Sequence, residues 1–305
     1  MEHRLIAAVF PGQGSQAIGM AQDFYQNSQA AKEILDRAEL ALPGLLEIMW
    51  QGPKESLTLT ENQQPALVAA GAAAFAAYKE AKGKSPSFAA GHSLGEYTAH
   101  VASGALTIED AVVLVNKRGK YMQEAVAEGV GAMAAILKTD NKTIEEVCKN
   151  TAGVVEIANY NSDGQTVISG EKQAVEAASE KLKSLKARAI PLKVSAPFHC
   201  SLMQSAADKL TKDLEKIEFK QADFPVISNV KAEIIKSPNQ INELLAQQVT
   251  ASVRWLETIQ NLDSLGVTSY YEFGSGKVLT GLIKRILKDA QAFSITEMAN
   301  LEEVI

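Results

Sequence analysis

Short runs of apolar residues alternate along the chain with longer segments in which apolar residues recur at helical spacing. Residues 5–10 are apolar without interruption, which is typical of a strand buried on both faces of a parallel sheet. Further strands are predicted at 87–90, 224–228 and 267–273. The helices predicted around them cover about 17–45, 64–81, 107–128, 204–214, 239–249 and 278–287, with one more ending near Gly104. This alternation predicts an α/β fold with a parallel sheet flanked by helices.

The segment from 130 to 195 has a different order of elements. Its predicted elements are a strand at 133–137, a helix at 142–149, strands at 154–158 and 165–169, a helix at 172–186 and a strand at 189–194. A turn-rich stretch, 159–164, joins the second strand to the third. The order βαββαβ is the ferredoxin-like pattern. We therefore predict a small domain, 130–195, inserted into a larger domain made of 1–129 and 196–305.

Composition and charge exclude several classes of function. The 305 residues carry a net charge of −6, from 30 basic and 36 acidic residues. Broad nucleic-acid binding needs a basic face and is not expected. No run of about 18 apolar residues could span a membrane, and no signal-peptide pattern opens the chain, so a cytoplasmic protein is expected. Cys148 and Cys200 form no paired motif, so neither a metal site nor a disulfide framework is expected.

The pentapeptide 91–95, Gly-His-Ser-Leu-Gly, fits the Gly-x-Ser-x-Gly nucleophile elbow. It lies between a predicted strand and a predicted helix, which is the context that an elbow requires. Flanking glycines let the backbone crowd, and a helix N-terminus favours developing negative charge. Ser93 is therefore the candidate nucleophile. The competing interpretation is a structural turn without chemistry.

A serine hydroxyl needs a general base, and the chain has only four histidines. His3 precedes the first strand. His92 is the neighbour of Ser93 on a sharp turn where side chains diverge, and His100 lies about 10 Å further along the helix. By elimination His199, in the loop that returns from the insert, is predicted to be the base. Its orienting partner stays open, since no acid after it has an evident motif and a carbonyl group could serve instead.

The turn 11–16, Pro-Gly-Gln-Gly-Ser-Gln, follows the first strand. Its glycines match a dinucleotide fingerprint, but the next stretch stays helical where that motif needs a strand ending in an acid. It also lacks the Gly-Lys-Ser/Thr of a phosphate loop. The better interpretation is a tight turn that supplies a backbone N–H as the second oxyanion donor, typically worth about 3–4 kcal/mol.

With these motifs in place, the chain resembles the malonyl-CoA:acyl carrier protein transacylases nearly from end to end. The resemblance rests on eight stretches in matching order and spacing: 10–16 (FPGQGSQ), 64–67 (QPAL), 91–97 (GHSLGEY), 118–122 (RGKYM), 159–161 (NYN), 196–200 (APFHC), 253–255 (VRW) and 274–281 (GSGKVLTG). It implies an α/β-hydrolase-like domain with a ferredoxin-like insert. It also implies malonyl transfer from coenzyme A to an acyl carrier protein through an acyl-serine, in support of fatty acid synthesis.

The resemblance implies roles at the matching positions. Ser93 is implied to be the acylated nucleophile and His199 its base. The backbone N–H groups of Gln13 and Leu94 are implied to form the oxyanion hole. Gln248 is implied to orient His199 through its main-chain carbonyl, in place of an acid.

Arg118 is implied to select the substrate. A malonyl group carries a free carboxylate, to which a guanidinium forms two parallel hydrogen bonds that lysine cannot copy. A neutral acetyl group leaves that buried charge without a partner. The other residues expected to line the pocket are Gln64, His92, Met122, Asn161 and Phe198. The ring of Phe198 is expected to crowd a 2-methyl group, which favours malonyl over methylmalonyl.

The expected partners are malonyl-CoA and an acidic acyl carrier protein. Coenzyme A and phosphopantetheine enter as parts of these substrates, so no separate cofactor is expected. Two basic groups are candidate docking sites for the carrier. They are Lys181, Lys183, Lys186, Arg188 and Lys193 in one stretch, and Lys284, Arg285 and Lys288 in another.

A monomer is expected. Three alternatives stay open. One is a free-standing malonyl acyltransferase of a polyketide pathway, and one is a thioesterase or ester hydrolase with the same elbow. The third is a non-catalytic scaffold that binds a carrier protein, which intact Ser93 and His199 disfavour.

Overall fold

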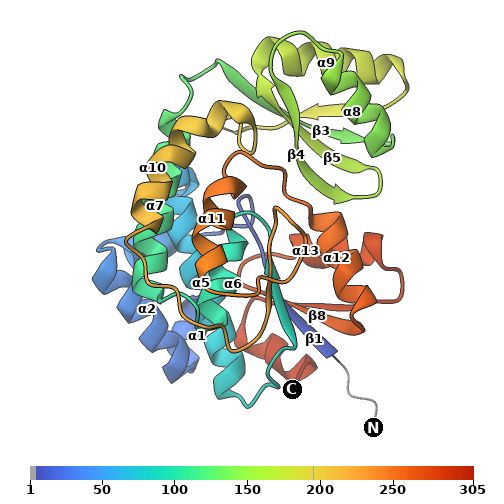
Figure 1. Cartoon of the computed structure of the whole chain (residues 1–305). Coiled ribbons are helices and arrows are strands. Elements are labelled where there is room, and N and C mark those ends of the chain that lie inside the picture. Colours follow the sequence, from blue (N-terminus) through green and yellow to red (C-terminus); the bar gives the residue numbers. More distant parts are fainter. Residues whose placement is uncertain (1–4, 195) are drawn as a thin grey trace.

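A parallel five-stranded sheet forms the centre of the larger part of the molecule (Figure 1). The computed structural model describes residues 5–194 and 196–305. The strand order is β7-β2-β1-β8-β9, and each neighbouring pair is parallel. The strands are β1 (Leu5–Phe10), β2 (Phe88–Gly91), β7 (Val226–Ile227), β8 (Val267–Phe273) and β9 (Gln291–Ile295). The predicted α/β fold with a parallel sheet is confirmed.

The central strand β1 is buried on both faces, as its uninterrupted apolar sequence predicts. Ala8 and Phe10 pack into one core with the helices over 29–41, 60–80, 95–102 and 108–124, whereas Ala7 and Val9 pack into a second core with the helices over 255–264 and 278–286. Successive side chains of a strand point to opposite faces, so one short run serves both cores.

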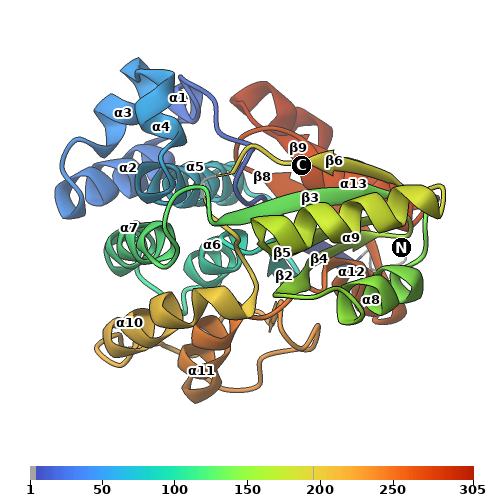
Figure 2. The same cartoon turned by 90° about the horizontal axis from the view of Figure 1, so that it is seen from above.

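Helices cover both faces of this sheet (Figures 1 and 2). Their bounds are α1 (Gln22–Asn27), α2 (Gln29–Ala41), α3 (Leu45–Gln51), α4 (Lys54–Thr58), α5 (Thr60–Glu80), α6 (Gly95–Ala102), α7 (Ile108–Glu124), α10 (Gln204–Leu214), α11 (Asn239–Gln248), α12 (Trp255–Ser264) and α13 (Val278–Ile286), with short 3₁₀ helices at Ser201–Met203 and Met298–Glu303. The prediction for 204–214 is confirmed to the residue. Thr107 caps α7 by accepting a hydrogen bond from the Asp110 N–H.

Several boundaries predicted from the sequence are wrong. The helical region predicted at 17–45 is divided, because Ser28 breaks it and caps α2. Helix α7 ends at Glu124 rather than near 128. Strand β9 was not predicted, because the edge strand 291–295 mixes polar and apolar residues. Helix α5 begins at Thr60, so the prediction that its start lies near Pro65 is also wrong.

The segment 131–191 forms a second sheet, which is antiparallel. Its elements are β3 (Gly131–Leu137), α8 (Asn141–Lys149), β4 (Val155–Ser162), β5 (Gln165–Glu171), α9 (Lys172–Ser184) and β6 (Arg188–Pro191), with strand order β4-β5-β3-β6. The element order matches the predicted βαββαβ order. The predicted turn over 159–164 is wrong, because strand β4 continues to Ser162 and only Asp163 and Gly164 form the turn. That 130–195 is a separate inserted domain stays a prediction, and its last residue lies outside the described residues.

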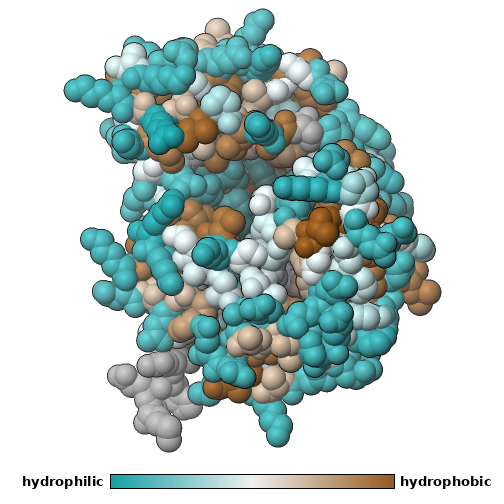
Figure 3. Space-filling model, turned by 180° about the vertical axis from the view of Figure 1, so that it is seen from behind, coloured by the Kyte–Doolittle hydropathy of each residue, from teal (hydrophilic) through white to brown (hydrophobic). Residues whose placement is uncertain are grey.

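The small sheet is joined to the rest of the chain by the segment before α12. Val253 accepts a hydrogen bond from the Tyr160 N–H at 2.9 Å and donates one to the Ala158 carbonyl at 2.8 Å. This pairing places one edge of the small sheet, strand β4, over the carboxyl ends of the large sheet (Figure 2). The surface is hollowed where the two parts meet (Figure 3). Within the described ranges, no helix has the length and apolar character needed to cross a bilayer.

Candidate active site

Ser93 lies at the tip of a strained turn between β2 and α6. Its φ is +51°, a left-handed conformation that is rare outside glycine. A Cβ on Gly91 would lie 1.9 Å from the Gly95 carbonyl carbon, and one on Gly95 would lie 2.0 Å from the Phe10 carbonyl oxygen. Only glycine fits at either position, so the two outer residues of the motif follow from the backbone crowding around the Ser93 turn.

His199 faces Ser93 across this turn. Its Nε2 lies 2.7 Å from Ser93 Oγ, and its Nδ1 lies 2.9 Å from the Gln248 carbonyl oxygen and 3.2 Å from that of Ala251. Since a carbonyl can only accept, Nδ1 carries the proton and Nε2 is left to accept from the serine hydroxyl. Burial, reinforced by the Arg118 charge, lowers the pKa of His199 to about 3. The imidazole is therefore neutral at neutral pH, which is the form that a general base requires.

The turn after β1 packs directly against the elbow. The His92 N–H donates to the Phe10 carbonyl at 3.0 Å, and a Cβ on Gly12 would lie 2.6 Å from the His92 carbonyl oxygen. The backbones of Gln13 and Leu94 are thus held on neighbouring turns beside Ser93. The Gln13 side chain donates to Gln63 Oε1 at 2.7 Å and accepts from Gln64 Nε2 at 3.5 Å. This arrangement suits a pair of backbone oxyanion donors.

Arg118 is fully buried beside the same serine. Its Nη2 lies 3.2 Å from Ser93 Oγ and 3.0 Å from Gln248 Oε1, and its Nη1 donates to Gln64 Oε1 at 2.8 Å. Its Nε has no acceptor among the described residues. Burial lowers the pKa of the guanidinium from its ordinary value. A buried cation with a spare donor next to a serine hydroxyl is the kind of group that can bind an anion.

A hydrogen bond near Pro65 joins helix α5, which carries Gln64, to helix α7, which carries Arg118. Proline has no N–H, so within a helix it leaves the carbonyl four residues earlier, that of Glu61, without its donor. Asn116 Nδ2 donates to that carbonyl at 2.8 Å. The bond fixes α7 against α5 two residues before Arg118, so a local defect in one helix sets the register of the other.

The remaining predicted pocket residues are distributed around this centre. His92 Nε2 lies 2.8 Å from Asn161 Oδ1, so the small sheet reaches the elbow through β4. Met122 is buried, with Sδ 3.9 Å from Gln64 Nε2. Phe198 is buried in the larger core and directly precedes His199 in the chain.

Two buried residues of the site carry no role in the sequence analysis. Asn229 Oδ1 accepts from the Ser93 N–H at 2.6 Å, and its Nδ2 donates to the Gly91 carbonyl at 2.6 Å. Glu96 Oε2 accepts from the Asn229 N–H at 3.1 Å and from Gln248 Nε2 at 2.6 Å. The available signals were an acid in the apolar helix after the elbow and an asparagine directly after a predicted parallel strand, where sites gather.

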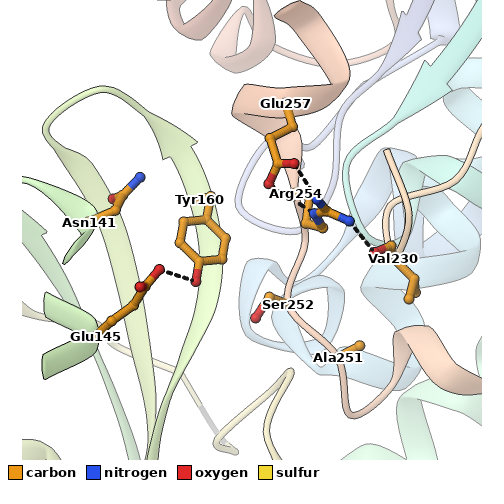
Figure 4. A pocket seen from close by; sticks show the side chains of 8 residues that line it. All are labelled: Asn141, Glu145, Tyr160, Val230, Ala251, Ser252, Arg254 and Glu257. Carbon is orange, nitrogen blue, oxygen red and sulfur yellow. Dashed lines mark hydrogen bonds and ion pairs between the residues drawn. The ribbon is translucent and has the colours of Figure 1, made fainter. Parts of the chain in front are cut away.

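A separate polar cleft of about 480 Å³ opens between β4 and the segment before α12 (Figure 4). Tyr160 donates to Glu145 on one wall, and Arg254 pairs with Glu257 on the other. Ala251 lines this cleft and also accepts from His199, but Ser93 and Arg118 do not reach it. The cleft therefore adjoins His199 through Ala251 and does not include Ser93. In the two described ranges, no three potential metal ligands gather at one place.

His100 is buried away from the site, against Phe219, and in the described part of the chain neither ring nitrogen has a hydrogen-bond partner. Burial lowers its pKa to about 3. Below about pH 6.5 the unfolded chain binds a proton here that the folded chain does not, so stability falls as pH falls. His100→Leu is expected to relieve about 1.4 kcal/mol of this loss at about pH 5.5 and almost none at about pH 8. Urea unfolding at both pH values measures it, and an equal change at both would contradict it.

Comparison with known proteins identifies the family. Residues 8–299 match the acyl transferase domain family, so the chain belongs to the acyl transferases. The malonyl CoA-acyl carrier protein transacylase of Bacillus subtilis is 46% identical over 305 residues, covering 98% of this chain and 96% of that protein. That of Escherichia coli is 44% identical over 295 residues, covering 95% and 96%. Within the acyl transferases, the chain is a member of the malonyl CoA-acyl carrier protein transacylases.

Solved structures agree with this assignment. A malonyl-transacylase in complex with its type II PKS acyl-carrier protein has a TM-score of 0.95 to this chain at 45% identity, covering 98% of both chains.

Proposed function

We propose that this chain transfers the malonyl group of malonyl-CoA to the phosphopantetheine thiol of an acyl carrier protein, through a malonyl ester on Ser93. The observation that carries the proposal is the meeting of three groups at one atom. Ser93 Oγ lies 2.7 Å from the nitrogen of a neutral histidine and 3.2 Å from a buried guanidinium. A base activates the nucleophile, and the guanidinium selects an acyl group that ends in a carboxylate.

In the first half-reaction, His199 Nε2 takes the Ser93 proton as Oγ attacks the thioester carbonyl carbon. The carbonyl oxygen becomes an oxyanion, which the N–H groups of Gln13 and Leu94 stabilise. The C–S bond then breaks, and coenzyme A leaves with the proton from His199. The Gln248 carbonyl holds the imidazole in the required tautomer throughout.

In the second half-reaction, the carrier's thiol gives its proton to His199 and attacks the ester carbonyl. The C–O bond to Ser93 breaks, and Oγ recovers the proton. Both thiols belong to the substrates, so the proposal includes no further cofactor. We also infer that Phe198 disfavours a 2-methyl group and that the enzyme is a cytoplasmic monomer.

Supply of fatty acid synthesis is the pathway that we propose. The Bacillus subtilis and Escherichia coli relatives are named malonyl CoA-acyl carrier protein transacylase, and this name fits a role in fatty acid synthesis. A polyketide pathway is the second candidate, because one solved relative is in complex with a type II PKS acyl-carrier protein.

We infer that the carrier docks near the basic residues Lys186 and Arg188. Both are exposed. Replacing both by glutamate is expected to raise the KM for the carrier about tenfold, because reversed charges repel an acidic partner, and to leave the KM for malonyl-CoA unchanged. Lys84→Glu, an exposed change before β2 at the opposite end of the strand from Ser93, is the matched control. Equal carrier KM values for the double variant and wild type would contradict this docking site. Lys284 and Arg285, from the second basic group, are the other candidate docking site. The Arg285 side chain donates a hydrogen bond to Gln165 Oε1 at 2.6 Å.

Initial-rate kinetics with both substrates test the proposed reaction. Malonyl-carrier formation and free malonate are quantified together while the two substrates are varied. Ping-pong transfer predicts parallel double-reciprocal lines and malonyl-carrier as the main product. Malonate as the main product, whatever the carrier concentration, would instead identify a hydrolase.

A further inference from the structure

The buried carboxyl group of Glu96 has no part in the reaction as derived above, yet it touches two residues that do position the site. Glu96 is fully buried on the first turn of α6, three residues after Ser93. Its Oε2 accepts both of its hydrogen bonds, and its Oε1 has no partner among the described residues. A buried carboxyl is costly to keep, so its contacts call for an explanation.

The first contact sets the orientation of the Gln248 side chain. A side-chain amide can present either its oxygen or its nitrogen to a neighbour, and Arg118 has only donors to offer. Gln248 Nε2 donates to Glu96 Oε2 at 2.6 Å and to the Ser93 carbonyl at 3.0 Å. With the nitrogen held there, Oε1 is the atom left to accept from Arg118 Nη2 at 3.0 Å.

The second contact reaches the elbow. The Glu96 carboxyl accepts from the Asn229 N–H, and the Asn229 side chain joins the Ser93 N–H to the Gly91 carbonyl. Asn229 thus braces both sides of a turn whose central residue has φ +51°. One oxygen atom therefore anchors the residue that holds the nucleophile and the residue that holds the guanidinium.

We propose that Glu96 is a positioning residue, whose Oε2 orients the Gln248 amide toward Arg118 and anchors the Asn229 brace of the Ser93 elbow. This inference rests on the proposed malonyl transfer. The position of the oxygen carries the effect, rather than the negative charge. Burial raises the pKa of Glu96 to about 7, so ionised and neutral forms coexist near neutral pH, and Oε2 accepts hydrogen bonds in both.

Two substitutions separate position from charge. Glu96→Gln removes the charge but keeps an oxygen in the place of Oε2, and its new amide nitrogen occupies the place of the unpartnered Oε1. Glu96→Asp keeps the charge but withdraws the oxygens by one methylene. Glu272→Asp is the matched structural control, because Glu272 is equally buried and its oxygens accept from Leu279 and Thr280 in α13 rather than from site residues.

The experiment measures single-turnover loading from malonyl-CoA and acetyl-CoA by intact-protein mass spectrometry, with melting temperatures of the same samples. Glu96→Asp is expected to lower the malonyl-to-acetyl loading ratio by about 10–100-fold, because a displaced guanidinium no longer meets the carboxylate. Glu96→Gln is expected to stay within about threefold of wild type. Glu272→Asp is expected to melt at a lower temperature with the wild-type ratio.

The inference is overturned if Glu96→Asp keeps the wild-type ratio, or if Glu96→Gln loses as much as Glu96→Asp. If Glu96→Asp does not fold, Glu96→Gln alone still overturns the inference when its malonyl-to-acetyl ratio falls about tenfold or more, because it keeps an oxygen at the place of Oε2. Wild type is measured in the same series. If wild type takes up no malonyl, the proposed function fails along with the inference; if it loads normally, only the inference is at stake.

Discussion

Ser93→Ala is expected to take up no malonyl group and to lower the turnover of malonyl transfer by roughly 10⁶-fold, the order of loss seen when a serine nucleophile is removed from a triad. The Ser93 hydroxyl oxygen lies 2.7 Å from His199 Nε2, which places it to be activated and acylated. Removal of one oxygen atom leaves the His199 and Arg118 side chains in place. The measurement is a time course of intact protein mass after addition of malonyl-CoA.

Ser103→Ala is the matched control for this change. Ser103 is buried at the end of α6, and its hydroxyl donates to the His100 carbonyl at 3.1 Å. This variant is expected to load like wild type. A malonyl-sized adduct on Ser93→Ala, at a rate near that of wild type, would place the nucleophile elsewhere.

Arg118→Ala is expected to lower the preference for malonyl over acetyl by about 10³-fold, with most of the loss in malonyl loading. Malonyl loses the binding free energy of the contact between its carboxylate and Arg118. Acetyl has no carboxylate and never makes that contact. The alanine also leaves Gln64 Oε1 and Gln248 Oε1 without a donor, so acetyl loading is not expected to exceed that of wild type by much. The measurement is competition between malonyl-CoA and acetyl-CoA, resolved by adduct mass.

Arg118→Lys tests the geometry of this contact. Lysine keeps the charge but cannot form two parallel bonds to a carboxylate, so its preference is expected to lie between those of wild type and Arg118→Ala. If Arg118→Ala keeps the wild-type ratio, the carboxylate is bound by another group and the proposed role of Arg118 is wrong.

The pairing of Ser93 with His199 could be predicted from the sequence. The elbow is a short motif whose two glycines follow from crowding inside five residues. The search for a base was short because the chain has only four histidines. The structure brings Ser93 and His199 within hydrogen-bond distance, although 106 positions separate them.

Contacts that depend on packing could not be predicted. Glu96 and Gln248 are 152 positions apart, and Ser93 and Asn229 are 136 apart. Nothing in the local pattern of an asparagine or a glutamine says which distant backbone it will face. The start of α5 was misplaced for the same reason, because the donor that compensates for Pro65 comes from Asn116 on another helix. The order of elements in the small sheet could be predicted from the pattern of apolar residues. The length of β4 could not, since pairing with β5 overrides the turn-forming residues at 159–162.

The most direct test of the central claim uses the loaded enzyme itself. Wild type is incubated with malonyl-CoA, separated from it by gel filtration, and then mixed with a phosphopantetheine-bearing carrier protein while the masses of both proteins are followed. Transfer through a malonyl-serine predicts that the adduct leaves the enzyme and appears on the carrier in equal amount. If the isolated enzyme carries no adduct, or if its adduct appears only as free malonate, the account is contradicted.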